Sequence, residues 1–322
     1  MKIVYHYDAG PELRARLAGL AESGLDISVC PVEDRDGFAR QMRDAEVLWH
    51  FLEPVTEAVI DASPKLRLIQ KIGVGVNTID LDAARRHGVH VCNMPGTNSR
   101  AVAEATLTLM LAALRRLPSF DAATRRGEGW SWEPALQDEL LELGGRCVGL
   151  VGYGAVPRIL APILRAMDAD VIYHARHAVP DAAGEFCSLP ELLSRADIVS
   201  LHVPLDDGTR LMIDEAALAS MKVGSVLVNT ARGGLIDEAA LVRALRSGPL
   251  RAAALDTFAE EPTPPDNPLL QLENVVLLPH LAWLTTETLE RSFAVAAENC
   301  RRLEAGESLL HSVVQGVMRR DV

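Results

Sequence analysis

The chain of 322 residues lacks several features that would place it outside the ordinary globular proteins. Its five cysteines are widely spaced and include no Cys-x-x-Cys pair, so the sequence indicates neither a disulfide framework nor a zinc knuckle. Long apolar runs are also missing, and the run Ala105–Leu114 ends far short of the roughly 18 residues that a membrane-spanning helix needs. The amino terminus reaches Asp8 before an apolar core of signal-peptide length can form. These absences predict a cytoplasmic protein that does not enter a membrane.

Positive charge is in short supply. The chain has 32 Lys and Arg against 44 Asp and Glu, a formal net charge of −12, which repels phosphate backbones and argues against a nucleic-acid partner. A small anionic ligand remains possible, because a few arginines and helix amino termini can reverse the field inside a cleft. Two histidine pairs, His87 with His90 and His174 with His177, have no third ligand nearby, so we predict no metal site.

Between about residues 145 and 280, short β-branched runs alternate with runs of helical periodicity, a pattern typical of βαβ units around a parallel sheet. The predicted strands are Arg146–Val151, Asp170–Tyr173, Asp197–His202, Ser225–Asn229, Ala252–Phe258 and Val275–Leu278. The predicted helices are Ala155–Met167, Leu189–Arg195, Glu215–Met221 and Glu238–Ser247. This block is expected to form one doubly wound α/β domain.

The first hundred residues repeat the alternation more weakly and predict a second α/β unit. Its strands are expected at Lys2–Tyr5, Glu46–Trp49, Leu66–Lys71 and His90–Asn93. A helix over Ala101–Leu117 should end at Pro118, and another over Thr286–Leu303 should stop before Gly306. The tail is expected to return to the first unit, which predicts domains of residues 1–98 with 283–322 and of residues 99–282.

The segment 118–143 carries Trp130 and Trp132 among polar and charged residues. Tryptophan outside both domain cores lies more often in an interface than in an active site, so we predict that this segment contributes to a homodimer.

A glycine turn follows the first strand of the central block. Gly152-Tyr153-Gly154 precedes a predicted helix, the context in which backbone amides can hold a pyrophosphate. The third glycine of the G-x-G-x-x-G pattern is replaced by Pro157. The helix can survive this proline, because an N–H near a helix start has no intrahelical acceptor, but its close packing on the sheet is left open. Pro162 should kink or loosen the same helix. The amides of Ala155 and Val156 remain. The turn predicts a dinucleotide site, with an ordinary tight turn as the alternative.

The next strand ends without an acidic residue. A site for NAD would place Asp or Glu here to hold the ribose 2′-hydroxyl, but the chain reads Ala175, Arg176, His177. A guanidinium can pair with a 2′-phosphate, so we predict NADP(H) as the preferred cofactor, with NAD(H) possible. The alternative is an exposed polar turn without a role.

Three residues follow strands at the same edge of the predicted cofactor sheet: Arg232, Glu261 and His280. Together they match what reduction of a 2-oxo acid requires. Arginine pairs with the carboxylate and polarises the carbonyl, protonated histidine supplies a proton to the oxygen, and glutamate orients the imidazole and stabilises its charge. Each residue alone also has an ordinary structural explanation.

These stretches closely resemble the D-isomer-specific 2-hydroxyacid dehydrogenases, glyoxylate and hydroxypyruvate reductases included. The motifs that carry the resemblance are Gly73–Val76 with Ile79–Asp80, Asn93–Gly96, Val102–Glu104, Gly144–Gly154, His202–Leu205 with Thr209, Val228–Glu238, Ala254–Pro262 and Pro279–His280. The resemblance implies a Rossmann-type cofactor domain, a smaller flavodoxin-like substrate domain closed by the tail, and a homodimer.

The resemblance also implies roles for particular residues. The amides of Val74 and Gly75 would hold the substrate carboxylate. The implied cofactor contacts, beyond the glycine turn, are Thr106, Val203, Pro204, Thr209, Thr230, Ala231 and Asp256.

The substrate pocket is expected to involve the first-domain loop and one aromatic residue. The phosphoglycerate-specific branch of the family has an arginine at the position of His50, whereas this loop continues with Phe51 and Leu52. This departure argues against a phosphorylated substrate. Trp283 matches an aromatic position that lines the pocket of lactate-type relatives, although Phe51 and Trp283 could equally be core or interface aromatics.

The sequence therefore predicts an NADP(H)-preferring D-2-hydroxyacid dehydrogenase. Its substrate would be a small unphosphorylated 2-oxo acid, of the glyoxylate and hydroxypyruvate class or bulkier. The alternative is a nucleotide-sensing binding protein like the C-terminal-binding corepressors, which resemble the same family. The complete set of Arg, Glu and His and the acidic composition favour the enzyme.

Overall fold

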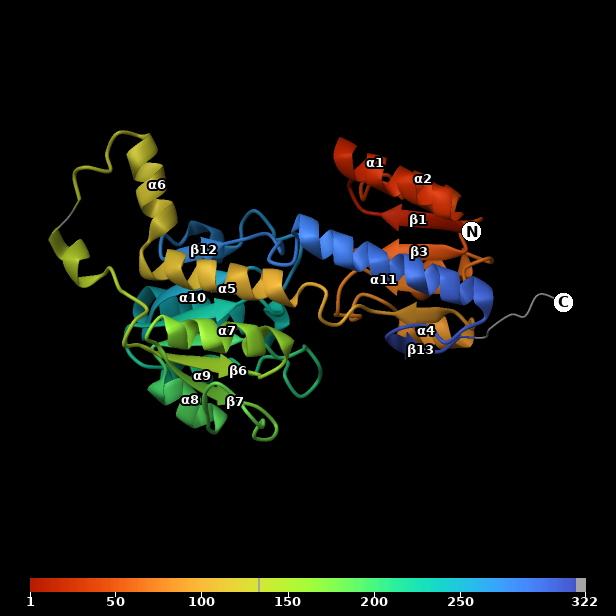
Figure 1. Ribbon diagram of the computed structural model, residues 1–322. Helices are drawn as coiled ribbons and strands as arrows, with labels where there is room; N and C mark the ends of the chain where they lie inside the picture. Colours follow the sequence, from red (N-terminus) through yellow and green to blue (C-terminus); the bar gives the residue numbers. More distant parts are fainter. Residues whose placement is uncertain (133, 317–322) are drawn as a thin grey trace. The chain divides into compact units, whose positions relative to one another are not determined.

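The computed structural model describes residues 1–132 and 134–316, which form two compact units (Figure 1). Unit 1 contains Met1–Asn98 and the chain from Thr285 onward, and unit 2 contains Ser99–Leu284. The divisions between the units lie after Asn98 and after Leu284, whereas the sequence analysis puts the domain divisions after residues 98 and 282.

Unit 2 is built around a parallel sheet of seven strands. They are β6 (Cys147–Val151), β7 (Asp170–His174), β8 (Glu185–Phe186), β9 (Ile198–Leu201), β10 (Ser225–Asn229), β11 (Leu250–Leu255) and β12 (Val275–Leu277). The strands lie in the order β12-β11-β10-β9-β6-β7-β8. From β6 the chain first adds strands on one side and then, from β9, on the other side of β6, as in dinucleotide-binding Rossmann sheets. The predicted Rossmann-type domain is confirmed. Ligands of such sheets bind beyond the carboxyl ends of the strands at this reversal, which is where β6 delivers the glycine turn.

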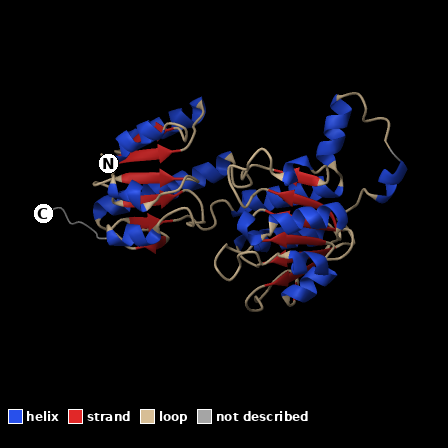
Figure 2. Ribbon diagram, turned by 180° about the vertical axis from the view of Figure 1, so that it is seen from behind, coloured by secondary structure: helices blue, strands red, loops and turns tan. Residues whose placement is uncertain are grey.

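Helices cover both faces of this sheet (Figure 2). They are α5 (Ser99–Leu114), α6 (Leu117–Arg125), α7 (Ala155–Ala166), α8 (Leu189–Arg195), α9 (Glu215–Ser220) and α10 (Glu238–Ser247), with short 3-10 turns at Pro134–Asp138, Gly233–Leu235 and Pro268–Gln271. One apolar cluster joins the sheet to α5 and α7, and a second joins it to α8, α9 and α10. The sheet is therefore buried on both sides, as its continuous apolar strands require.

Prolines lie in two helices of unit 2. Pro157 is buried in the first turn of α7, where a missing N–H has no intrahelical partner to lose, so the helix survives it as expected. The helix continues through Pro162, whose ring is exposed. The predicted helix over Ala101–Leu117 ends early, at Leu114. Pro118 does not stop it but lies in the first turn of α6, after Arg116 has turned the chain at φ 48°.

Unit 1 contains a six-stranded sheet with helices on both faces. Its strands are β1 (Lys2–His6), β2 (Asp26–Cys30), β3 (Val47–His50), β4 (Leu68–Lys71), β5 (His90–Cys92) and β13 (Ser312–Val314). Its helices are α1 (Pro11–Gly19), α2 (Arg35–Met42), α3 (Glu57–Asp61), α4 (Leu81–Arg86) and α11 (Thr286–Ala305), with a 3-10 turn at Leu20–Ser23. The five parallel strands follow the order β2-β1-β3-β4-β5, which confirms the flavodoxin-like expectation.

The tail after Gly306 adds β13 antiparallel to β5 at the edge of this sheet. Before it, α11 packs on unit 1 through Phe293, whose ring stacks on Trp49 at 5.6 Å, and through Asn299, whose amide donates to Gln70 Oε1 at 2.7 Å. Unit 1 is thus discontinuous in sequence.

Candidate active site

The glycine turn after β6 has the geometry of a pyrophosphate cradle. Gly152 has φ 98°, and a Cβ there would lie 2.7 Å from the carbonyl oxygen of His202, so no other residue fits without strain. Gly154 is the exposed N-cap of α7, and a Cβ on it would meet no atom within 4 Å. The amides of Ala155 and Val156 follow in the first turn of α7, where N–H groups lack intrahelical acceptors. The turn therefore fits an anionic phosphate group.

The end of β7 lies at the same sheet edge, because Val151 pairs in register with His174. Ala175 follows, partly buried, and Arg176 and His177 are exposed. His174 Nδ1 lies 3.1 Å from the carbonyl oxygen of Cys187. No carboxylate follows the strand directly, so a cation and a small residue occupy the position where the ribose would lie.

The loop after β9 carries Val203, Pro204 and Thr209. The Thr209 hydroxyl donates to the Pro204 carbonyl at 2.6 Å and accepts the Asp206 N–H at 2.9 Å, which closes the loop on itself. At the start of the loop, the ring of His202 lies 2.9 Å from the Ser200 hydroxyl, and burial lowers the His202 pKa to about 3. His202 is therefore neutral near pH 7. Contact of the loop with a cofactor stays a prediction.

The loop after β10 is organised by side chains. The Asn229 amide donates to the Arg232 carbonyl at 2.8 Å, and its oxygen accepts the Ala231 N–H at 3.0 Å. Thr230 shares a hydrogen bond of 2.8 Å with Thr106, whose hydroxyl also bonds the Val102 carbonyl. Both threonines are buried, Thr106 with no exposed surface and Thr230 at 8%, and contact of either with a cofactor stays a prediction.

Arg232 lies in this loop and is held close to the Glu261 loop. Its guanidinium donates to the Ala231 carbonyl at 2.6 Å, and its pKa is lowered by burial, against the raising effect of the charges of Glu261 and Asp256. A Cβ on the next residue, Gly233, would lie 1.8 Å from the carbonyl carbon of Phe258. Only glycine allows the two backbones to approach this closely, and their approach brings Arg232 and Glu261 into one region.

Glu261 and His280 form a hydrogen-bonded pair. His280 Nδ1 lies 2.6 Å from Glu261 Oε2, while Glu261 Oε1 accepts the Phe258 N–H at 2.9 Å. Burial raises the pKa of Glu261, but the hydrogen bond and charge of His280 more than offset this and leave the pKa below its usual value. Glu261 is thus ionised, and a carboxylate paired with Nδ1 leaves Nε2 as the nitrogen that gains or loses a proton.

His280 has an unusual backbone conformation, φ 57°, that Asp256 stabilises. The His280 N–H donates to the Asp256 carbonyl at 2.7 Å, and the buried Asp256 carboxylate accepts the amides of Leu281 at 2.8 Å and Ala282 at 3.1 Å. Burial raises the Asp256 pKa, against these hydrogen bonds. The implied cofactor contact of Asp256 remains a prediction, whereas its bonds show a positioning role beside His280. Strained backbone of this kind clusters at functional sites.

Trp283 lies beside the same segment. Its indole N–H donates to the His280 carbonyl at 3.0 Å, and the side chain is almost fully buried. The side chain therefore supports the histidine, and a substrate contact stays a prediction.

The predicted substrate residues of unit 1 differ in exposure. His50 and Phe51 are buried, with the Phe51 ring stacked on Tyr7 at 4.7 Å, whereas Leu52 is partly exposed. Burial first, and then the charge of Lys71, lower the pKa of His50 to about 3, so this imidazole is neutral. Of the three residues His50, Phe51 and Leu52, Leu52 is the one whose side chain reaches the surface.

The loop of Val74 and Gly75 is fixed by hydrogen bonds from Asn93 and Met94. Asn93 Nδ2 donates to the Val74 carbonyl at 2.9 Å, and the Met94 N–H donates to the Gly73 carbonyl at 2.8 Å. Val74 is 44% exposed and Gly75 is partly exposed, so both lie where a small carboxylate can approach their backbone.

Sequence reasoning missed Glu238, in the first turn of α10. Its carboxylate accepts the Ala259 N–H at 2.6 Å and the Asn267 amide at 3.2 Å, which ties the Glu261 loop to α10. The only sequence signal was the acidic pair Asp237-Glu238 at a helix start, where Asp237 caps α10. That signal indicates a helix end but not a partner 21 residues away.

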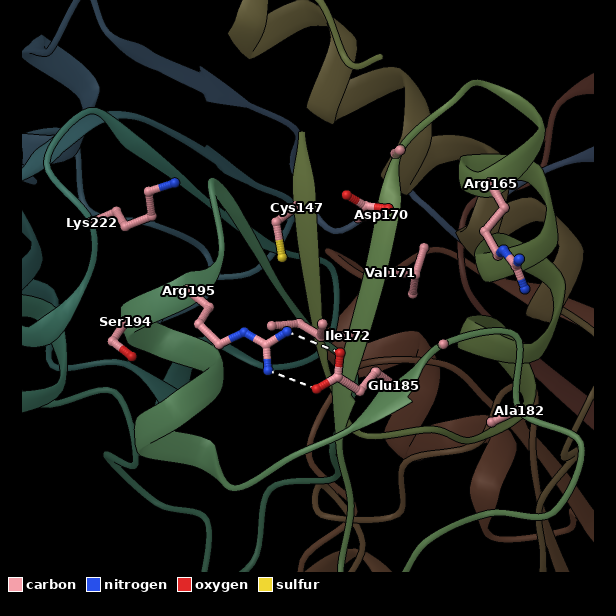
Figure 3. A pocket seen from close by; sticks show the side chains of 12 residues that line it. Cys147, Arg165, Asp170, Val171, Ile172, Ala182, Glu185, Ser194, Arg195 and Lys222 are labelled. Carbon is pink, nitrogen blue, oxygen red and sulfur yellow. Dashed lines mark hydrogen bonds and ion pairs between the residues drawn. The ribbon is translucent and has the colours of Figure 1, made fainter. Parts of the chain in front are cut away.

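A cavity of about 730 Å³ lies elsewhere in unit 2 (Figure 3). It is lined by the first residues of β6 and β7, Cys147 and Asp170, and so lies at the opposite end of these strands from the glycine turn. Its Arg195 forms hydrogen bonds of 2.8 and 2.9 Å with Glu185. Lys222, which also lines the cavity, donates to Asp197 at 2.6 Å, and none of the sequence-predicted site residues lies in the lining.

Within residues 1–132 and 134–316, no cluster of three or more His, Cys, Asp or Glu side chains could hold a metal ion. In the same described part of the chain, no helix has both the length and the apolar character to cross a membrane.

Known proteins resemble this chain over most of its length. Residues 107–282 match the model of the D-isomer specific 2-hydroxyacid dehydrogenase NAD binding domain. A glyoxylate reductase of Aeropyrum pernix is 41% identical over 266 residues, which are 80% of this chain and 79% of that protein. A D-3-phosphoglycerate dehydrogenase of Mycobacterium tuberculosis is 39% identical over 288 residues, 88% of this chain but only 54% of that protein.

Among solved structures, the TT0316 protein of Thermus thermophilus superposes with a TM-score of 0.88 at 36% identity, covering 98% of this chain and 100% of its own. The domain match, the relatives and the shared two-unit fold agree with the motifs read from the sequence. The chain belongs to the D-isomer specific 2-hydroxyacid dehydrogenase family and is a nicotinamide-dependent oxidoreductase.

Proposed function

We propose that this protein is an NADP(H)-preferring D-2-hydroxyacid dehydrogenase that reduces a small unphosphorylated 2-oxo acid to the D-2-hydroxy acid. The observation that carries the proposal is the pair of Glu261 and His280, whose side chains are 2.6 Å apart. The close approach of Gly233 to Phe258 brings the loop of Glu261 next to Arg232. A protein that only bound a nucleotide would not need a histidine whose imidazole is hydrogen-bonded to a carboxylate. The arrangement therefore favours an enzyme over a corepressor-like binding protein.

The proton is handled by His280. With Nδ1 donating to ionised Glu261, the protonated imidazole carries its exchangeable proton on Nε2, and Glu261 stabilises that charged form. A bound nicotinamide supplies the hydride. His280 gives its proton to the carbonyl oxygen of the 2-oxo acid, which becomes the hydroxyl, and regains a proton from solvent afterwards.

Arg232 holds the substrate by charge and shape. Guanidinium remains protonated even where burial lowers its pKa, and its planar fork matches a carboxylate. Partial burial strengthens this attraction relative to water. We propose that Arg232 orients the 2-oxo acid with its carbonyl toward His280. For unit 1, we propose, as the family resemblance implies, that the amides of Val74 and Gly75 are donors to a carboxylate.

The glycine turn and the end of β7 supply the cofactor proposal. The first turn of α7 offers amides to a pyrophosphate, and Arg176 is an exposed cation where a 2′-phosphate would lie. The absence of an acid at Ala175 removes both an attraction for the ribose of NADH and a repulsion of NADPH.

The proposed size and charge of the substrate are supported by His50 in unit 1 and by the relatives. His50 is buried and neutral, so it cannot replace the arginine that phosphoglycerate-specific relatives carry at this position. Glyoxylate reductases are among the similar proteins. We therefore propose an unphosphorylated acid of the glyoxylate and hydroxypyruvate class or bulkier.

The proposed quaternary structure is a homodimer. The segment with α6 and the 3-10 turn Pro134–Asp138 stands away from the rest of unit 2 in Figure 1, and Trp130 and Trp132 on it are 88% and 50% exposed. Exposed tryptophan is unfavourable in water and typical of interfaces. Analytical ultracentrifugation should give a mass near twice 34.9 kDa, and Trp130→Ser with Trp132→Ser should shift it to the monomer.

The function is tested with a panel of 2-oxo acids. Glyoxylate, hydroxypyruvate, pyruvate, 2-oxoisocaproate and 3-phosphohydroxypyruvate are assayed with NADPH and with NADH, and the product is resolved on a chiral column. We expect achiral glycolate from glyoxylate, D-2-hydroxy acids from the other unphosphorylated substrates, and higher kcat/KM with NADPH. A preference for the phosphorylated substrate, or binding of NADPH without turnover of any acid, would contradict the proposal.

A further inference from the structure

Tyr153 lies between the two glycines of the turn and reaches a distant loop. Its side chain is only 7% exposed, and its hydroxyl accepts the N–H of Ala183 at 2.7 Å. The Arg158 guanidinium of α7 lies 5.9 Å from the centre of its ring. One side chain thus connects the turn that fits a pyrophosphate to a segment 30 residues further along the chain.

Tyr173, the second-last residue of β7, holds the same segment at another point. Its hydroxyl accepts the Val179 N–H at 2.8 Å and donates to the Val179 carbonyl at 3.4 Å. The rings of Tyr153 and Tyr173 are in contact, with centroids 4.3 Å apart. The hydroxyls of two adjacent buried tyrosines therefore bind the backbone amides of Val179 and Ala183.

The segment they bind, residues 175–184, is called the ribose segment here. It contains neither helix nor strand, and it opens with Ala175, Arg176 and His177. At its far end, a Cβ on Gly184 would lie 2.9 Å from the Val171 carbonyl oxygen, so the chain returns tightly against β7. An irregular segment of this length has few backbone hydrogen bonds of its own, and the tyrosine hydroxyls supply them.

Packing alone does not account for the hydroxyls. Phenylalanine would fill the same space in the apolar cluster that contains Tyr153 and Tyr173. What tyrosine adds is a hydrogen-bond partner for the amides of Val179 and Ala183, and a buried amide without a partner is costly. The hydroxyls therefore restrict the backbone conformations of the segment that carries Arg176.

We propose that Tyr153 and Tyr173 are positioning residues for the adenosine end of the dinucleotide. By fixing the ribose segment against the glycine turn, they hold Ala175 and Arg176 in the orientation that binds the ribose, so that little ordering remains to be done when the cofactor binds. This inference rests on the proposed binding of the cofactor at the turn. The inference concerns how tightly the preferred dinucleotide binds. It does not concern whether NADPH or NADH is preferred.

The test uses Tyr153→Phe, Tyr173→Phe and the matched control Tyr5→Phe. Tyr5 lies in unit 1, and its buried hydroxyl has no hydrogen-bond partner within the described residues. Amide hydrogen exchange is followed in the enzyme without cofactor, and Kd for NADPH and NADH is measured by fluorescence titration. Kinetic constants are then determined at saturating 2-oxo acid.

We expect exchange in the ribose segment to accelerate in Tyr153→Phe and Tyr173→Phe, at the Ala183 and Val179 amides respectively. Kd and KM for the preferred dinucleotide should rise about three- to tenfold, the usual effect of one hydrogen bond, while kcat at saturating cofactor stays within about twofold. Tyr5→Phe should match wild type in all of these measurements.

Faster exchange with unchanged Kd would overturn the inference, because the segment would then be fixed without serving the cofactor. Unchanged exchange would overturn it as well. Failure of the proposed function has a different signature: wild type would bind NADH more tightly than NADPH, or reduce no 2-oxo acid, while the Tyr→Phe variants still weakened the tighter-bound dinucleotide and loosened the segment.

Discussion

His280 and Glu261 lie 19 residues apart in sequence and 2.6 Å apart in space, with Nδ1 of the imidazole against Oε2 of the carboxylate. The carboxylate is held at its other oxygen by the Phe258 amide, and the histidine backbone is held by Asp256. Both members of the pair are therefore fixed by bonds outside the pair. Such a pair holds the imidazole in one orientation with Nε2 available, which is what proton transfer to a bound carbonyl requires.

The first prediction concerns the proton donor. His280→Ala removes the group that protonates the carbonyl oxygen, so we expect turnover for 2-oxo acid reduction to fall about 10²- to 10⁴-fold. Cofactor Kd, measured by quenching of protein fluorescence, should change less than about twofold, because the imidazole acts on the acid rather than on the dinucleotide. A variant with turnover close to that of wild type would refute the assignment.

Glu261→Gln should act through His280. The amide keeps the size of the side chain but removes the negative charge that stabilises the imidazolium during proton transfer. In the reduction direction, the limb of the pH–rate profile at which activity falls with rising pH should move to lower pH. A profile that coincides with wild type would show that the two residues are not coupled in catalysis.

Arg232→Lys keeps the positive charge but loses the planar fork. We expect kcat/KM for 2-oxo acids to fall about 10²-fold or more, with the affinity for the dinucleotide unchanged, because a point charge cannot make two parallel hydrogen bonds to a carboxylate. Steady-state kinetics with a single acid at several concentrations measures the loss. Parity with wild type would make a bidentate contact untenable.

Cofactor preference is tested at the end of β7. An Arg176 contact with a 2′-phosphate is worth about 1.5–3 kcal/mol, which corresponds to roughly a tenfold to hundredfold preference for NADPH. Ala175→Asp should reverse the preference by attracting the ribose of NADH and repelling the phosphate of NADPH, whereas Arg176→Ala should weaken NADPH alone. Kinetics with both cofactors decides between these outcomes, and a wild type that favours NADH would contradict the assignment.

Acid sensitivity of folding should depend on His202. Burial lowers its pKa in the folded protein to about 3, below the value near 6.5 of an unfolded chain, so its stabilising contribution is present above pH 6.5 and is lost as the pH falls. Between about pH 7.5 and 5.5 the loss is about 1.4 kcal/mol in the free energy of unfolding. His202→Gln should flatten that part of the pH dependence in urea titrations.

The control for this experiment is His177→Gln, because His177 is exposed and gains nothing from burial. We expect this variant to follow wild type at both pH values. Equal pH dependence of wild type and His202→Gln would mean that the buried imidazole does not contribute to acid sensitivity.

The sequence alone was sufficient for many of the elements and for the edge on which the site lies, although it did not predict β2, β8 or the division between α5 and α6. Strands such as Ser225–Asn229 and helices such as Glu238–Ser247 were predicted at their observed bounds, since β-branched runs and helical periodicity are local properties. Because parallel strands all end at one edge, the loops carrying Arg232, Glu261 and His280 could be assigned to that edge from the strand pattern alone.

Only the tertiary structure decided which groups meet there. The contact of Gly233 with Phe258, the bonds of Asp256 to the amides after His280, and the reach of Tyr153 to Ala183 join residues far apart in sequence. The helix break at Arg116 and the return of β13 to β5 likewise depend on what the chain packs against. A sequence pattern reports the preference of a residue for a conformation, but its hydrogen-bond partner is set by the approach of distant backbones, and that approach exists only in the folded chain.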